Sequence, residues 1–253
     1  MKTLMQSVFR ALLVPAVLLL IWELVAAPGQ EFLAKPSEIA PVAWQILLDG
    51  TLLKNASQTF AAALGGFSIG VSAGVFFGLM LGLYPTFARI SEIPFETIRP
   101  IPSVALVPLS LLTFGFGLRM EVAVVAFGCF WPAAIYANAA AQQIEPRLEE
   151  VSRNLGLGFF KRMWSVIIPA SLPTIFVGIR IAAALALVIS VTVEVAANPR
   201  GLGYAMIIAQ QTLKPALAFA YLFWIGIIGV LLNYLLVSIQ LKYFAAGTKI
   251  RRP

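Results

Sequence analysis

The chain has 253 residues, of which 60% are hydrophobic and 11% are charged, well below the roughly 25% charged residues of an average soluble domain. Its formal net charge of +7 comes without a dense basic run or a nucleic-acid-binding motif, so we expect no nucleic-acid partner. The basic residues are better explained by the orientation of a membrane protein, whose cytoplasmic loops are rich in lysine and arginine. The absence of histidine excludes serine–histidine and metallohydrolase chemistry, and the single cysteine, Cys129, forms neither a disulfide nor a cysteine metal site within the chain.

Six stretches are apolar and long enough to be candidates for crossing a hydrocarbon core, which needs roughly 20 residues of helix. They lie near residues 8–27, 59–83, 101–117, 119–141, 172–194 and 216–241. The first could be a signal peptide, but five further spans favour an uncleaved helix. The third is short and begins among prolines, which predicts an irregular start. The sequence therefore predicts one all-α, six-helix transmembrane domain over residues 1–253.

Lysine and arginine are unevenly divided between the two sets of predicted loops. If the N-terminus is cytoplasmic, that side holds twelve basic residues and the other side five, with Arg180 inside a span, which accounts for all 18. The positive-inside rule then places both termini in the cytoplasm. Residues 142–171 become the longest cytoplasmic connection. Residues 28–58 face the other side, where Trp44 and its apolar neighbours predict a short interfacial helix.

Glycine recurs every four residues in the second predicted span. A turn of about 100° per residue puts these glycines on one slowly drifting stripe. Small residues allow helix backbones to approach closely in a membrane. The stripe predicts a packing face, either static or one along which another helix slides during gating. Its members are Gly66, Gly70, Gly74, Gly78 and Gly82.

The 142–171 connection carries two short amphipathic segments. Pro146 suits the first turn of a helix that ends at Gly156, where glycine permits a sharp turn. A second helix follows, with one apolar face made of Phe160, Met163, Trp164 and Ile167. Pro169 then precedes the fifth span. Such a helix pair could dock into a groove on a soluble partner or rest on its own bundle, and periodicity leaves both open.

Few ionisable side chains lie within the predicted spans. Arg180 and Glu194 are fourteen residues apart, about 21 Å along a helix, so they cannot pair within it. We interpret Arg180 as structural and Glu194 as a carboxylate at the end of its helix, bonded to a loop or reaching the interface. Glu121 is placed at a helix end and receives no role.

Several motifs together resemble one family. Residues 150–156 (EVSRNLG), followed after ten residues by Ile167-Ile168-Pro169, resemble the EAA motif of binding-protein-dependent ABC importer permeases, with Val151 and Ser152 where alanines are usual. Other segments resemble the nitrate, sulfonate and taurine branch of these permeases. They include RPIP at 99–102, FGFG at 114–117, FWP at 130–132, GIRIA at 178–182 and GLGY at 201–204. The resemblance covers roughly residues 55–245.

This resemblance implies a type I importer permease of the bacterial inner membrane that works as a pair, which we expect to be a homodimer. A cytoplasmic ABC ATPase dimer would receive the loop, and a periplasmic substrate-binding protein would deliver the substrate. The ATPase would bind ATP and Mg, because the chain has no P-loop pattern of its own. We expect no cofactor or metal in this chain, and a transport subunit, not an enzyme. The coupling residues would be Glu150, Arg153, Gly156, Phe160, Trp164, Ile167 and Pro169.

The branch resemblance points to a small oxyanion such as an aliphatic sulfonate, taurine, nitrate or bicarbonate. A pyrimidine-type vitamin precursor is the alternative for the same kind of permease. A secondary transporter, a channel and an intramembrane enzyme are the rival classes; the lack of an obvious buried carboxylate pair argues against the enzyme. Neutral donors suit anion passage, although hydroxyls also bond back to their own helix. The candidates for lining the pathway are Ser103, Ser110, Thr113, Ser190 and Thr192.

Overall fold

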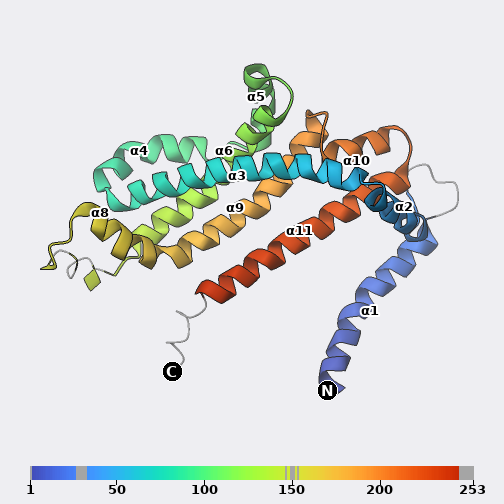
Figure 1. Cartoon of the computed structure of the whole chain (residues 1–253), viewed down its shortest axis with the longest axis horizontal. Coiled ribbons are helices and arrows are strands. Elements are labelled where there is room, and N and C mark those ends of the chain that lie inside the picture. The colour runs from blue at the N-terminus through green and yellow to red at the C-terminus, as the bar shows by residue number, and fades with distance from the viewer. Residues whose placement is uncertain (1, 27–32, 146, 149–151, 153, 245–253) are drawn as a thin grey trace.

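A computed structural model describes residues 2–26, 33–145, 147–148, 152 and 154–244, and no β-strand occurs among them. The chain folds as a row of helices (Figure 1). The first half contains α1 (Lys2–Val25), α2 (Pro36–Leu48), α3 (Thr51–Leu83), α4 (Pro85–Ile98), the 3-10 turn η1 (Ser103–Leu106), α5 (Val107–Phe114) and α6 (Leu118–Gln142). The second half contains α8 (Phe159–Arg162), the π-helix η2 (Met163–Ile167), α9 (Ile168–Ala196), α10 (Leu202–Gln211) and α11 (Pro215–Phe244).

Four helices in these described ranges are long and apolar enough to cross a membrane: α3, α6, the continuous η2–α9 helix and α11. A fifth span exists only if α4 and the η1–α5 segment count as one, and these two bend by 84°. The apolar part of α1, Leu13–Val25, is shorter. The all-α membrane fold is therefore confirmed, while the number of six spans stays a prediction.

The predicted span at 101–117 is not one straight helix. Its first residues form the 3-10 turn η1, and α5 is only 8 residues long. Prolines explain the break, since Pro100 and Pro102 lack an N–H to continue the α4 hydrogen bonds and Pro108 starts the new helix. The sequence did not predict α4 and α10 as separate helices. Both are short and adjoin longer ones, so hydropathy alone does not separate them.

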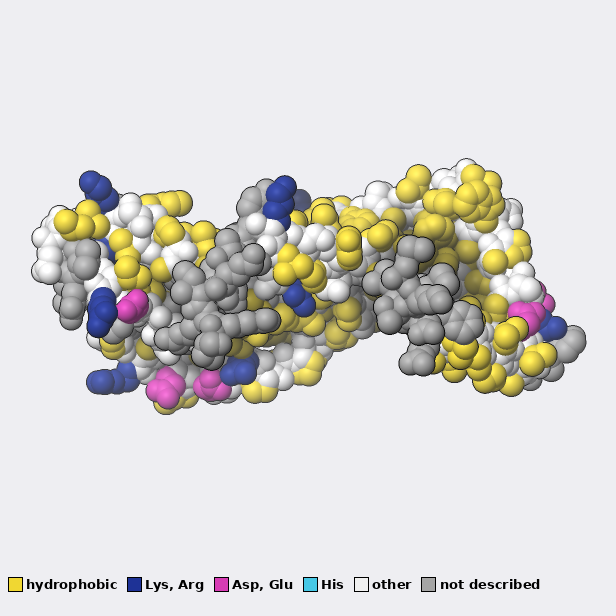
Figure 2. Space-filling model, turned by 90° about the horizontal axis from the view of Figure 1, so that it is seen from below, with side chains coloured by type: hydrophobic (Ala, Val, Ile, Leu, Met, Phe, Trp, Pro, Cys, Tyr) yellow, Lys and Arg dark blue, Asp and Glu magenta, His cyan; other side chains and the backbone are white. Residues whose placement is uncertain are grey.

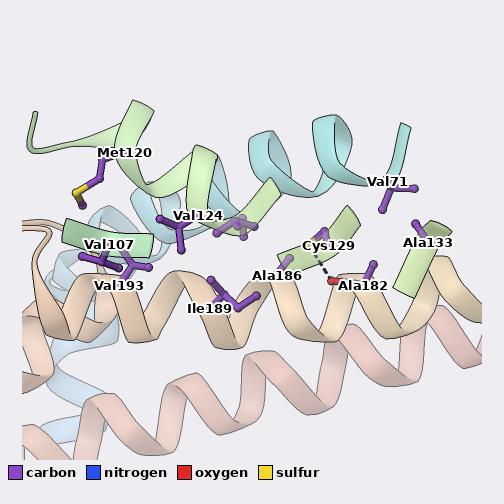
Figure 3. Packing of buried hydrophobic residues seen from close by; sticks show 12 residues of the cluster. Val71, Val107, Met120, Val124, Cys129, Ala133, Ala182, Ala186, Ile189 and Val193 are labelled. Carbon is purple, nitrogen blue, oxygen red and sulfur yellow. Dashed lines mark hydrogen bonds between the residues drawn. The ribbon is translucent and has the colours of Figure 1, made fainter. Parts of the chain in front are cut away.

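The main core lies between α3, α6 and α9. Small and β-branched side chains fill it, and Val125, Ala182 and Val193 are completely enclosed. Figure 3 shows α6 residues meeting α9 residues across this layer. Cys129 is fully buried, and its Sγ donates to the Ala182 carbonyl at 3.3 Å, so it acts as a small core residue.

The glycine stripe of α3 faces α6. A Cβ atom on any of its five glycines would come closer than 3.0 Å to an atom of α6, a separation that real Cβ atoms essentially never show. At Gly74, for example, the added Cβ would lie 2.9 Å from Ala133 Cβ. The two helices therefore approach so closely that only glycine fits. Whether they also slide along one another stays a prediction.

A second cluster joins α2, α10 and α11 to the beginning of α3. Trp224 donates its Nε1–H to the Ala43 carbonyl at 3.0 Å, and Asn55 Nδ2 lies 3.3 Å from the Tyr221 hydroxyl. In α1, Glu23 accepts the Ser37 hydroxyl of α2 at 2.6 Å. Figure 1 shows α1 diverging from the bundle beyond this contact. The attachment of α1 thus depends on its last turns.

Apolar side chains cover much of the surface seen in Figure 2. Most of the charged side chains visible there lie in the half that holds α4 and α8. In α11, no residue of the most apolar 18-residue window is buried. Such a surface suits contact with lipid or with another apolar protein face.

We predict that Gly74→Ala destabilises the protein, because the added methyl group overpacks the α3–α6 contact. Overpacking costs typically about 1–3 kcal/mol, which exceeds the gain of about 1 kcal/mol that alanine gives a helix over glycine. The control is Gly226→Ala in α11, where an added Cβ meets nothing within 4 Å. Thermal unfolding in lipid should show a lower midpoint for Gly74→Ala only. Equal midpoints for both variants would contradict the tight contact.

Candidate functional site

The segment before α9 combines a glycine turn with a short helix. Gly156 has φ +62°, a left-handed conformation that disfavours side chains, and an added Cβ there would meet nothing within 4 Å. The N–H of Leu157 bonds to the Ser152 carbonyl at 3.1 Å across this turn. Glycine is therefore required here by backbone conformation and not by lack of space. Of the predicted coupling residues, Glu150 and Arg153 lie outside the described residues, as does the side chain of Phe160.

The helix that enters α9 does not present the single apolar face that the sequence predicted. Residues 163–167 form a π-helix, and the N–H of Ile168 bonds to the Met163 carbonyl five residues earlier. This wider turn changes which residues share a face. As a result Ile167 is buried against the bundle while Trp164 is 70% exposed. Pro169 is exposed at the start of α9, inside the continuous Met163–Ala196 helix, where its missing N–H removes one helix hydrogen bond.

The predicted pathway hydroxyls differ in hydrogen bonding and in burial. Thr113 donates to the Leu109 carbonyl at 2.8 Å and Thr192 to the Val188 carbonyl at 2.7 Å, so both hydroxyls bond back to their own helices. Ser110 and Ser190 are buried, and Ser103 is half-buried. The role of these residues along a pathway stays a prediction.

A buried polar cluster occupies the other end of α9. Glu121 in the first turn of α6 is 2% exposed, and Glu194 near the end of α9 is 1% exposed. The two carboxyl groups are close enough to interact, and Asn198 donates its Nδ2–H to Glu121 Oε2 at 2.5 Å. The expectation that no buried carboxylate pair exists is therefore wrong. The pair joins residues distant in sequence, and only the packing of α6 on α9 brings them together.

Glu194 also fixes the start of α10. The N–H of Gly203, in the first turn of α10, donates to Glu194 Oε2 at 2.8 Å, so this carboxylate is bonded inside the bundle and does not reach the interface. The N–H of Leu202 donates to Thr59 Oγ1 at 3.0 Å. The N–H of Gly201 donates to Gln58 Oε1 at 3.1 Å. Side chains of α3 and α9 thus satisfy three consecutive N–H groups that a helix start leaves free.

Arg180 links α9 to α11. Its Nη1 donates to Gln240 Oε1 at 2.9 Å, and the contact is partly buried. This bond agrees with a structural role for the arginine. It holds the two helices together roughly midway along α9.

Comparison with known proteins identifies what the chain resembles. A family model described as the binding-protein-dependent transport system inner membrane component matches residues 70–250. A putative ABC transporter permease of Methanocaldococcus jannaschii is 30% identical over 237 residues, 91% of this chain and 89% of that protein. A putative aliphatic sulfonates transport permease of Bacillus subtilis is 27% identical over 87% of this chain and 81% of that protein. The taurine transport system permease of Escherichia coli is 29% identical over 89% and 85%.

A solved structure has the same fold. A chain of the MetNI methionine ABC transporter, solved in inward-facing conformations, matches with a TM-score of 0.56 and 21% sequence identity. The match covers 81% of this chain and 95% of that chain. This likeness concerns the fold alone.

We predict that Gly201→Ala destabilises the α9–α10 corner more than Gly115→Ala destabilises the loop after α5. Both glycines have positive φ, +94° and +69°, with ψ near 180°, so both substitutions carry backbone strain of about 1–3 kcal/mol. Only at position 201 would the new Cβ also press on the Glu194 carboxyl group, with Oε2 at 2.7 Å, whereas at 115 it meets nothing within 4 Å. Unfolding midpoints measured in lipid should be lower for Gly201→Ala than for Gly115→Ala. The opposite order would refute the packing role of Glu194.

Proposed function

The chain belongs to the family of inner-membrane components of binding-protein-dependent transport systems, the permeases of ABC importers, and we propose that this permease carries a small oxyanion, most simply a sulfonate. The observation that carries the proposal is its similarity, over more than four-fifths of its length, to permeases named for aliphatic sulfonates and taurine. Both names denote substrates with a sulfonate group. Nitrate and bicarbonate belong to the same class of small oxyanions.

The distribution of charge inside the bundle is compatible with such a substrate. Among residues of described burial, the buried charged side chains are Glu121 and Glu194, and no lysine or arginine is fully buried. A pathway without a fixed buried cation would not trap an anion, whereas neutral donors can hold it briefly. We propose Ser103, Ser110 and Ser190 as the first such donors to test, because the hydroxyls of Thr113 and Thr192 already donate to their helices.

Because members of this family are multi-pass inner-membrane proteins, the orientation of the chain in the membrane decides on which side each partner binds. We place both termini in the cytoplasm, which puts the 142–171 loop on the side of an ATPase dimer that binds ATP and Mg. The α9–α10 corner then faces a periplasmic substrate-binding protein, and a second copy of the chain completes the permease. The excess of basic residues near the loop side supports this orientation.

The continuity of α9 suggests how ATP binding would move the pathway. The η2 helix runs into α9 without a break, and α9 has 29 residues, about 44 Å of helix. Exposed Trp164 gives the ATPase an aromatic contact at one end, and Glu194 holds α10 at the other. ATP-driven closure of the ATPase would tilt α9 from an inward-open to an outward-open arrangement. Coupling requires that the ATPase bind one arrangement more tightly.

The experiment that tests the substrate class measures ATP hydrolysis by the complex of permease and ATPase in lipid. The binding protein is added empty or loaded with an aliphatic sulfonate, taurine, nitrate or bicarbonate. We expect stimulation by one loaded oxyanion and not by the empty binding protein. Stimulation by a pyrimidine-type vitamin precursor, with none by any oxyanion, would overturn the substrate class and leave the permease assignment in place.

We predict that Gly156→Val reduces substrate-stimulated ATP hydrolysis and transport at least tenfold or prevents binding of the ATPase. A β-branched side chain in the left-handed conformation costs at least about 1–2 kcal/mol, so the turn should rearrange. The control is Gly158→Val, because Gly158 has open space around it and no positive φ. Copurified ATPase and stimulated hydrolysis are measured for both. Normal coupling by Gly156→Val would remove the turn from the proposed mechanism.

A further inference from the structure

Arg180 is a cation inside a membrane-spanning helix, and its hydrogen-bond partner is neutral. It is half-buried, and within the described residues its side chain bonds to the amide oxygen of Gln240 in α11. The sequence of α11 contains no aspartate or glutamate. The acidic residue of α9, Glu194, lies fourteen residues away, about 21 Å along the helix. Neither of the two helices that hold Arg180 therefore supplies a counter-charge, although charges inside spans normally have one.

The position of Arg180 along α9 corresponds to the level of lipid headgroups. The continuous Met163–Ala196 helix has 34 residues, about 51 Å, whereas the hydrocarbon core of a bilayer is about 30 Å thick. Arg200 follows α9 and Lys214 precedes α11, and both are exposed, so they mark one boundary of that core. About 20 residues back along α9, or about 30 Å, lies Arg180. Its guanidinium group is thus near the opposite boundary, where phosphate groups begin.

Arg180 lies on the side of α9 that faces α11, and Figure 1 shows these two helices running next to each other. Leu187 is two turns further along the same side of α9, and its Cδ2 lies 3.8 Å from where a Cβ on Gly229 of α11 would be. Gln240 follows three turns after Gly229, again on one side of α11. The exposed side of α9, which includes Val188, points elsewhere. The guanidinium group therefore occupies the seam between α9 and α11.

This α9–α11 seam combines accessible N–H donors with an apolar surface. Arginine has five N–H groups, and the bond to Gln240 uses one of them. Among the described atoms, no nitrogen of Arg180 is enclosed without a partner, so its other N–H groups are accessible. Lys242 is exposed two residues beyond Gln240. Apolar side chains of α11 that are more than half exposed continue from here toward the middle of the bilayer: Leu231, Tyr234 and Leu235.

We propose that Arg180 and Lys242 bind the phosphate group of an anionic phospholipid in the α9–α11 seam, with an acyl chain lying along α11. The planar guanidinium group matches two phosphate oxygens at once. Basic pockets between membrane-spanning helices are suited to lipid headgroups. Gln240 is a positioning residue, because its amide oxygen holds the guanidinium group in the seam. The lipid supplies the negative charge that α9 and α11 lack at this level.

A transported sulfonate would offer the same oxyanion chemistry as a lipid phosphate. The phospholipid is favoured because Arg180 lies at headgroup level and faces α11, beside an apolar surface long enough for an acyl chain. A small sulfonate has no use for that surface. The experiment therefore compares a phospholipid with free oxyanions.

The test uses the complex of permease and ATPase in micelles of neutral detergent and phosphatidylcholine, titrated with phosphatidylglycerol at constant ionic strength. We expect phosphatidylglycerol to raise the unfolding midpoint saturably, by several degrees, and native mass spectrometry to detect it bound to the complex. Arg180→Gln should weaken this binding about tenfold or more, because charge-assisted hydrogen bonds to the phosphate are lost. The control is Arg200→Gln, which removes the same charge at the opposite boundary and should leave the binding unchanged.

Gln240→Glu separates lipid binding from the packing of Arg180. This variant keeps the arginine and puts a carboxylate within reach of it, so an internal ion pair should replace the phosphate. We expect phosphatidylglycerol binding to weaken about tenfold, while the midpoint in phosphatidylcholine alone stays the same or rises. If Arg180 only joined the two helices, Gln240→Glu would leave the response to phosphatidylglycerol unchanged. Arg180→Lys keeps the charge and should retain part of the binding.

Three results would overturn the proposal. The first is the absence of any response to phosphatidylglycerol. The second is an equal response in wild type, Arg180→Gln and Gln240→Glu, which would mean general attraction of anionic lipid to a basic surface. The third is a response to taurine or inorganic phosphate that requires Arg180 and equals the response to phosphatidylglycerol, which would mean a site for free oxyanions. The substrate class is tested by ATP hydrolysis with the loaded binding protein, so it stands or falls separately.

Discussion

The backbone contact between α3 and α6 is the constraint on which the bundle depends. Within a bilayer the hydrophobic effect does not drive helices together, so close packing must do so. Glycines at five successive turns of α3 allow the α6 backbone to approach until even a methyl group would collide. This contact fixes the position of α6, and the small side chains of α6 in turn receive α9. The buried carboxylates then meet because α6 and α9 are held at this distance and register.

The α9 helix connects the glycine turn and π-helix at its start with the polar corner at its end. At its start lie a glycine turn, a π-helix and an exposed tryptophan, all suited to contact with another protein. At its end lies a polar corner in which side chains of α3 and α9 bind three consecutive N–H groups of residues 201–203. The residues before the start of α9 include an exposed tryptophan, whereas the corner at its end is held by hydrogen bonds. A helix with such ends can transmit a displacement, since its rigid middle moves both ends together.

Prolines before α5 and the π-helix η2 decided the local backbone in the two places where hydropathy and periodicity alone were insufficient. The prolines before the apolar stretch at 101–117 predicted its irregular start, and the chain bends by 84° there, between α4 and the η1–α5 segment. Helical periodicity put Trp164 and Ile167 on one face, and one π turn separated them. The apolar faces of α1 and α11 remain uncovered in the single chain, as expected of elements that contact lipid or a second copy.

The amino-acid sequence by itself determined the all-α membrane class, most of the long apolar helices, the glycine packing face and the family. These depend on composition and on spacings within one segment, which are local properties of the chain. Only the tertiary structure decided which helix receives the glycines, that Glu121 faces Glu194, and that Thr59 and Gln58 bind the start of α10. The physical reason is that these contacts join segments far apart in sequence. Their geometry depends on how closely backbones pack, and no periodicity within a single helix records that distance.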